Sequence, residues 1–306
     1  MYKPFRFGII IEDVQTREEL IGRARRAEAL GYDTLLVPDH FSTLAPISTL
    51  MALADATTTI RIGSHVFGND FRSPAMLARE VAALDQLSGG RFQLGLGCGY
   101  LQADYQQAGI PLEEPKVRVD RFQEALFIIK HYFTDEEVNF SGKYYSVTGL
   151  KGSTIHVQKP HPPIYIGGGG NGKRMLKIAG READIVGVSI GTTESVKERL
   201  SWLRDAAQER FEQLELATMV FSVVVTDQRE AVAQRIASSQ QSGPERRSFS
   251  LTPEQVLDSL QFLIGSEDQI VETLLNRRER LGYSFIQVAG KYLEAFAPIV
   301  ARLAGK

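Results

Sequence analysis

The chain has 306 residues, of which 43% are hydrophobic and 24% charged, a composition typical of a folded globular protein and unlike that of a disordered or collagen-like chain. Its 35 basic and 37 acidic residues give a net charge of −2, so it lacks the basic excess of a protein that binds nucleic acid. Its single cysteine, Cys98, excludes an internal disulfide, and with no apolar run of ~18 residues and no recognisable signal peptide we expect a cytoplasmic protein that does not bind membranes.

Buried strands alternate with helical patterns from the start of the chain. Phe7–Ile11 is a continuous apolar run, and Thr16 with Glu19 forms a capping box for a helix that ends at Gly31. Further strands are predicted at 34–37, 60–67 and 92–97, and a helix between the last two begins after Ser73-Pro74 and ends at Gly89-Gly90.

The same alternation continues to the C-terminal end. Strands are predicted at 163–167, 184–188, 219–225 and 284–288. Helices are predicted at 117–133, 172–179 and 194–210, after Thr252-Pro253, and from Ser266, with Gln269 three residues on, to Gly282.

Eight continuous apolar strands separated by helices are typical of a parallel sheet closed into a (β/α)8 TIM barrel, here a single domain over 1–306. The alternative, a doubly wound dinucleotide fold, needs glycines after its first strand, where this chain has Glu12-Asp13-Val14. The longest connections follow strands four and seven, and we expect both insertions to lie mostly over the carboxyl-terminal rim of the barrel. Within the second, the polar stretch Ser238–Ser250 is expected to be a mobile loop.

Candidate chemical groups follow the predicted strands, because active sites of this fold form at the strands' carboxyl ends. Asp39-His40 follow strand two, and a histidine there can donate or accept a proton near neutral pH. A loop histidine that binds a neighbouring carboxylate is an equally supported interpretation. After strand three, His65 and Asn69 can point polar groups at a ligand, although an irregular strand end explains the segment as well.

Two glycine-rich segments follow strands four and five. Gly95–Tyr100 allows a flat ligand to approach the main chain, and Cys98 within it has no evident base nearby, which favours a packing role. Gly167–Arg174 nearly matches a phosphate-binding loop, but Arg174 replaces the hydroxyl residue that would hold magnesium. Its amides at a helix start, with Lys173 and Arg174, still predict an anion site. No spacing of histidines predicts a metal site.

Three of these segments together resemble the bacterial luciferase-like superfamily, and in particular its branch that uses the deazaflavin coenzyme F420. They are Val37-Pro38-Asp39-His40-Phe41, the run Leu87–Tyr100 that contains Ser88-Gly89-Gly90-Arg91, and Pro163–Gly169. The resemblance covers nearly the whole chain. It implies a TIM barrel with a flavin or deazaflavin ring over the strand ends, and a non-proline cis peptide at His65-Val66 that backs the ring.

The resemblance also implies site residues. His40 matches a position near the ring, and we predict that it is the proton donor or oxyanion partner. The residues predicted to bind the cofactor, from the resemblance and the motifs together, are Asp39, His65, Val66, Asn69, Gly97, Cys98, Gly99, Tyr100, Gly168, Gly169, Gly170, Lys173 and Arg174.

One departure concerns the start of the loop after strand four. Many deazaflavin enzymes of the family have an acidic residue there, where this chain has Tyr100-Leu101-Gln102. This disfavours a sugar-phosphate dehydrogenase and suggests that Tyr100 is an aromatic wall of a substrate pocket, with Phe67 and Phe71.

The predicted function is an oxidoreductase that moves a hydride between reduced F420 and a small organic substrate, with the protein supplying orientation and electrostatics. A monooxygenase that uses reduced FMN and oxygen has the same fold and glycines and is the alternative. A non-catalytic flavin-binding protein is a further alternative. Members of the family that dimerise do so through barrel helices, so a homodimer is expected.

Overall fold

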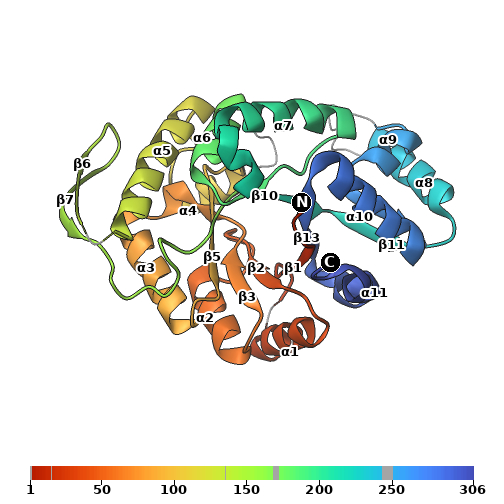
Figure 1. The fold of residues 1–306 in the computed structure, drawn as a ribbon, viewed down its shortest axis with the longest axis horizontal. Coiled ribbons are helices and arrows are strands. Elements are labelled where there is room, and N and C mark those ends of the chain that lie inside the picture. The colour runs from red at the N-terminus through yellow and green to blue at the C-terminus, as the bar shows by residue number, and fades with distance from the viewer. Residues whose placement is uncertain (1, 15, 135, 168–171, 243–250) are drawn as a thin grey trace.

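The structure is a computed structural model and describes residues 2–14, 16–134, 136–167, 172–242 and 251–306. Parallel strands form a closed barrel wrapped by helices, which confirms the predicted TIM barrel (Figure 1). The strands pair in the order β3-β2-β1-β13-β10-β9-β8-β5, and a β3–β5 pairing closes the ring. They are β1 (Arg6–Ile10), β2 (Thr34–Val37), β3 (Arg61–Ser64), β5 (Phe92–Gly97), β8 (Ile164–Ile166), β9 (Ile185–Gly187), β10 (Glu215–Val220) and β13 (Tyr283–Ala289).

The helices begin and end largely where the sequence predicts. The capping boxes of Thr16 and Ser266 are present, and Gly282 ends its helix in the left-handed conformation that glycine favours (φ 86°). The α-helices are α1 (Arg17–Ala29), α2 (Pro46–Ala56), α3 (Pro74–Leu87), α4 (Gln102–Ala108), α5 (Pro115–Tyr132), α6 (Lys173–Glu182), α7 (Thr193–Ala207), α8 (Arg229–Ser242), α9 (Pro253–Asp258), α10 (Glu267–Leu281) and α11 (Leu293–Leu303). The 3-10 helices are η1 (Asn69–Phe71), η2 (Gln208–Gln213) and η3 (Gly290–Tyr292).

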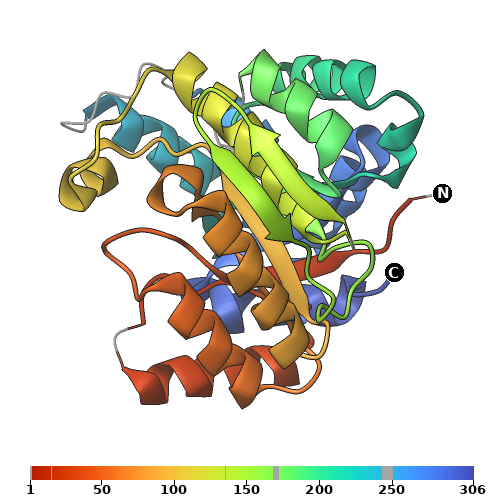
Figure 2. The ribbon, with the colours of Figure 1, turned by 90° about the vertical axis from the view of Figure 1, so that its left-hand side faces the viewer.

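The insertion after strand four contains an antiparallel hairpin, β6 (Glu137–Ser141) and β7 (Ser146–Lys151). Contrary to the prediction for this insertion, most of the hairpin does not cover the rim. The hairpin lies along the outside of α5, as Figure 2 shows. The Glu124 carboxylate in α5 accepts hydrogen bonds from the amides of Lys143, Tyr144 and Tyr145 and so holds the turn. Within the hairpin, the turn is the part that approaches the rim, where the Tyr145 hydroxyl accepts a hydrogen bond from Asn69.

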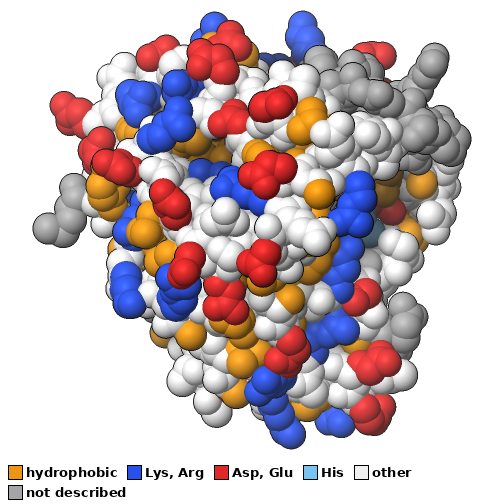
Figure 3. Space-filling view, turned by 90° about the vertical axis from the view of Figure 1, so that its right-hand side faces the viewer, with side chains coloured by type: hydrophobic (Ala, Val, Ile, Leu, Met, Phe, Trp, Pro, Cys, Tyr) orange, Lys and Arg blue, Asp and Glu red, His pale blue; other side chains and the backbone are white. Residues whose placement is uncertain are grey.

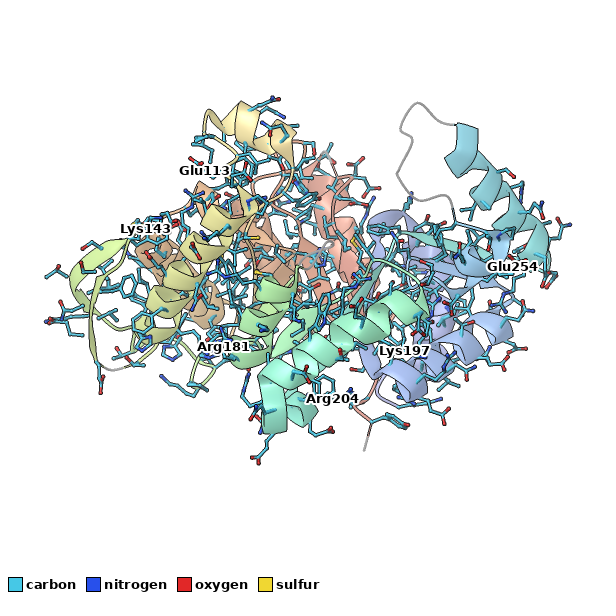
Figure 4. The ribbon with its side chains drawn as sticks, turned by 90° about the horizontal axis from the view of Figure 1, so that it is seen from above. Glu113, Lys143, Arg181, Lys197, Arg204 and Glu254 are labelled. Atoms are coloured by element: carbon cyan, nitrogen blue, oxygen red, sulfur yellow. The ribbon has the colours of Figure 1, made fainter. Side chains whose placement is uncertain are left out.

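The insertion after strand seven forms a small unit beside the barrel, on the side opposite the hairpin. Figure 4 places Glu254 of α9 and Lys143 of the hairpin turn at opposite sides of the molecule. β11 (Ser222–Val225) pairs with β12 (Phe262–Gly265), and the unit has an apolar core of its own, made of Val232, Ala233, Ala237, Val256 and Ile264.

One sequence prediction in this region is wrong, and a second is wrong for residues 238–242 and untested for the rest. The strand predicted at 219–225 joins the end of β10 to β11, because the apolar pattern continues through the point at Phe221 where the chain leaves the barrel. In the predicted mobile loop, 238–242 are the last residues of α8, and 243–250 lie outside the described residues.

The face of the molecule that carries this small unit has mixed charge. On the face that bears α8 to α11, acidic and basic side chains alternate among the described residues (Figure 3). No helix in the described ranges combines the length and the apolar character needed to cross a membrane.

Candidate active site

The side chain of His40, just beyond β2, lies at the carboxyl-terminal mouth of the barrel and is bonded to Asp104. Its Nδ1 is 2.6 Å from Oδ2 of Asp104 in α4, and the other carboxylate oxygen accepts the Phe41 amide at 3.2 Å. Because an ionised carboxylate only accepts hydrogen bonds, we assign the proton to Nδ1. The Asp104 side chain is 6% exposed and that of His40 28% exposed, so Nε2 remains available to a substrate.

Asp104 is the site residue that sequence reasoning missed. The family position for an acid after strand four corresponds to Tyr100-Leu101-Gln102 in this chain, none of which is acidic. The structure has the acid at Asp104, two residues after Gln102, inside a short helix. The histidine–carboxylate pair and an open position for proton transfer occur together, so the two interpretations of His40 do not exclude each other.

The Asp104→Asn variant tests this pair. An asparagine can present its amide group to Nδ1 and so allows the other tautomer, with the proton on Nε2. We expect kcat to fall by about 10²-fold or more with little change in cofactor affinity. The control is Asp55→Asn, which changes an exposed acid on α2. An unchanged kcat and pH–rate profile for Asp104→Asn would show that the pair has no part in turnover.

A buried polar cluster holds α4 in place. The hydroxyl of Tyr105 donates to Asp70 at 2.8 Å, and Asp70 forms a two-point ion pair with Arg121. Gly99 has φ 73°, and a Cβ there would lie 1.9 Å from the Tyr105 hydroxyl. Gly99 is therefore required by the close approach of Tyr105, which neighbours Asp104.

Two predicted cofactor-binding residues bind other parts of the protein. The Asp39 carboxylate pairs with Arg72 and accepts the Gly68 amide at 2.9 Å. The Asn69 amide donates to Asp70 at 3.2 Å as well as to the hairpin turn. Both residues fix the segment that follows strand three, and direct contact with a cofactor stays a prediction for them.

The peptide bond between His65 and Val66 is cis, as predicted. It separates β3 from β4 (Phe67–Gly68), which pairs again with β5. A Cβ at Gly97 would lie 2.7 Å from the Val66 side chain, and one at Gly167 would lie 3.2 Å away. These glycines therefore make room for Val66, which is half-buried and gives the mouth an apolar surface.

The other residue of the cis bond, His65, is enclosed by polar and aromatic groups. Its Nε2 is 3.0 Å from Oε1 of Gln287, and its ring centroid is 5.5 Å from that of Tyr165. Burial lowers the pKa of His65 to about 4, against the opposing effect of the hydrogen bond to Gln287. His65 is therefore neutral at pH 7.

This pKa predicts a pH dependence of stability. The pKa of His65 is near 6.5 in the unfolded chain and about 4 in the folded protein. Its contribution to the free energy of unfolding is therefore fully present above pH 6.5 and is lost as the pH falls to about 4. We expect wild type to lose about 2–3 kcal/mol relative to His65→Asn across this interval. Urea unfolding of both proteins from pH 7 to pH 4 measures the difference, and parallel stability curves would contradict the assignment.

The predicted residues that follow β5 have different surroundings. Burial raises the pKa of the Cys98 thiol, which therefore stays protonated at neutral pH, and the Cys98 carbonyl accepts from Arg118 at 3.2 Å. Tyr100 is 73% exposed, and its ring stands edge-on to His40 at 6.0 Å. Phe67, in contrast, is fully buried, so its predicted place in an aromatic wall is wrong.

The predicted anion site is described only at its edge. Gly168, Gly169 and Gly170 lie outside the described residues. Lys173 begins α6 with its ammonium 5.4 Å from the ring of Trp202, and Arg174 forms an ion pair with Asp120 of α5. In the described part of the chain, no three His, Cys, Asp or Glu side chains gather as they would around a metal ion.

A cavity of about 310 Å³ opens at the other end of the barrel. Its lining includes Lys3, Leu200 and Arg204 of α7, and Leu281. Because it lies at the amino-terminal ends of the strands, it is separate from the mouth that holds His40.

Comparison with known proteins places the chain in a family. The model of the family described as luciferase-like monooxygenase matches residues 3–284. The chain belongs to this family.

Among curated luciferase-like relatives, the F420-dependent glucose-6-phosphate dehydrogenase of Amycolatopsis mediterranei is 34% identical over 176 residues, which are 54% of this chain and 51% of the relative. The 5,10-methylenetetrahydromethanopterin reductase of Archaeoglobus fulgidus is 31% identical over 179 residues, 58% of this chain and 51% of the relative. The chain thus spans about half the length of the curated relatives it matches.

Solved structures with the luciferase-like fold superpose on nearly the whole chain. The F420-dependent tetrahydromethanopterin reductase of Methanopyrus kandleri gives a TM-score of 0.78 at 20% identity and covers 98% of this chain and 99% of its own. EDTA monooxygenase from Chelativorans sp. BNC1 gives 0.79 at 14% identity and covers 99% of this chain and 95% of its own. At these identities the likeness establishes the shared barrel and leaves the choice of cofactor open.

Proposed function

We propose that the chain is an oxidoreductase that moves a hydride between coenzyme F420 and a small organic substrate. The observation that carries the proposal is the His40–Asp104 pair, which leaves one ring nitrogen available at the mouth of the barrel. The similarity to curated relatives named as F420-dependent enzymes supports this choice of cofactor.

The residues at the mouth fit a deazaflavin. The half-buried side chain of Val66 offers an apolar surface to a flat ring, and Gly97, which has no side chain, lets Val66 pack closely against β5. Lys173, at the start of α6, would hold the phosphate of the cofactor tail together with the amides of the helix. When bound, the deazaflavin supplies a two-electron hydride carrier that does not readily activate oxygen.

The protein's contribution is proton transfer and orientation. Asp104 fixes the His40 ring through Nδ1, and the protonated ring can give its Nε2 proton to the carbonyl oxygen of the substrate as hydride reaches the carbonyl carbon. In the reverse direction the same nitrogen accepts the hydroxyl proton of an alcohol. His65, which is neutral, takes no part in this proton transfer and instead supports the cis segment between β3 and β4.

Anaerobic turnover tests the proposed function. The chain is mixed with reduced F420 under argon and offered a panel of uncharged ketones and enones. We expect the absorbance of oxidised F420 to return in proportion to the alcohol or saturated ketone formed. Substrate conversion with reduced FMN that requires oxygen, and none with F420 under argon, would contradict the proposal and favour a monooxygenase.

We also propose a homodimer. Met76 and Leu87 on α3 are 53% and 67% exposed, and the neighbouring Val157 is 48% exposed. A second copy packed on this barrel helix would remove apolar surface from water. Light scattering after size exclusion tests this directly, and a monomeric mass at micromolar concentration would contradict it. A cytoplasmic location stays a prediction from the sequence.

A further inference from the structure

Two exposed aromatic residues come next to His40, one in space and one in sequence. Tyr100 stands edge-on to the histidine ring, and Phe41, the residue after His40, is 51% exposed although its own amide is bonded to Asp104. Phe71 supports Phe41 with ring centroids 6.0 Å apart, and the buried Tyr105 in turn packs against Phe71 at 5.3 Å. The Phe41 ring is therefore held on one side by Phe71 and remains half exposed. Exposed aromatic surface beside a reactive group is typical of a binding site for an apolar ligand.

The arginines around this aromatic pair are bound to other groups. Arg72 pairs with Asp39, Arg121 with Asp70, and Arg118 donates to backbone carbonyls. Because the hydrogen-bond donors of these arginines are already used, they would not compensate an anionic substrate for the hydration that it loses on binding.

We infer that the substrate is uncharged and presents an aromatic group to Phe41 and Tyr100, with its reacting oxygen toward Nε2 of His40. This inference rests on the proposed function, because it places the substrate in the same mouth as the deazaflavin. It excludes sugar phosphates as good substrates, although several curated relatives are named for glucose 6-phosphate.

The test compares ligands that differ in one property. The F420-loaded chain is titrated with acetophenone, with 4-acetylbenzoate, which adds a charge, and with cyclohexyl methyl ketone, which removes the aromatic ring. We expect acetophenone to bind at least about 10-fold more tightly than 4-acetylbenzoate, because the carboxylate would be desolvated without a partner. We expect a smaller advantage, about 3- to 10-fold, over the saturated ketone.

A matched pair of variants locates the binding. With F420 saturating, Tyr100→Leu is expected to weaken acetophenone binding about 3- to 10-fold. Tyr2→Leu makes the same substitution at a tyrosine that is 58% exposed at the far end of the barrel, and it should not change acetophenone binding.

The outcomes separate the inference from the proposed function. Affinity for F420 is measured before any ketone is added, and failure of F420 to bind would overturn both. Normal F420 binding with equal or tighter binding of 4-acetylbenzoate would overturn the inference alone. Equal binding of acetophenone and the saturated ketone, or an unaffected Tyr100→Leu variant, would likewise overturn the aromatic contact while the hydride-transfer function stands.

Discussion

The His40→Asn variant is expected to lose about 10²- to 10⁴-fold in kcat while it keeps its affinity for F420. The shorter amide can still donate a hydrogen bond toward Asp104, so the buried carboxylate need not be left unpaired. It has no nitrogen that can exchange a proton at the position of Nε2. The loss should therefore appear in kcat, since the cofactor contacts that we propose at Val66 and Lys173 are unchanged.

Single-turnover kinetics with a saturating ketone measures the effect on the chemical step, and cofactor binding is measured on the same preparation. Asp55→Asn, at an exposed position of α2, is the control for handling and folding. Retained turnover in His40→Asn would remove His40 from the chemistry. Loss of both F420 binding and turnover would show instead that His40 holds the cofactor.

The Arg6→Met variant is expected to destabilise the fold by about 3–5 kcal/mol. Arg6 lies inside the amino-terminal end of the barrel, where it donates to Asp33 at 2.8 Å and to Glu215 at 2.5 Å. It also donates to Thr34 and Gln93, and its guanidinium lies 4.5 Å from the ring centroid of Phe285. Methionine fills a similar volume but leaves Glu215, whose side chain is 10% exposed, without its cation.

Urea unfolding measures this loss, and Arg26→Met is the matched control. Arg26 forms a two-point ion pair with Glu294, but the two side chains are 53% and 63% exposed. Because solvent screens such a pair, its removal should hardly move the unfolding midpoint. Adding Glu215→Leu to Arg6→Met should recover part of the loss, since the unpaired carboxylate is then gone. A small effect of Arg6→Met alone would show that Glu215 does not depend on Arg6.

The barrel could be predicted from the sequence because each of its strands is buried on both faces. Thr34–Val37 and Phe92–Gly97 are such runs, and their limits were predicted correctly. The hairpin could not be predicted in this way, since in β7 no side chain is fully buried and no apolar period appears. Helix α2 was missed as well, because Ala45 precedes it and offers no capping side chain.

The parts of the candidate site that lie within one short segment of the chain could be predicted from the sequence. The cis bond at His65-Val66 and the glycines beside it follow from a local motif and a family resemblance. The bond between His40 and Asp104 joins residues 64 positions apart and depends on how α4 packs against Gly99. Such a pair exists only after folding, so no local pattern indicates which acid meets His40.

Side-by-side titration of the cofactor-free chain with F420 and FMN, followed by fluorescence, shows directly which of the two cofactors the chain binds. We expect tight, saturable binding of F420 and much weaker binding of FMN, and we expect Lys173→Ala to weaken the F420 complex. Tight FMN binding with weak F420 binding would contradict hydride transfer with F420 and would favour an oxygen-using monooxygenase.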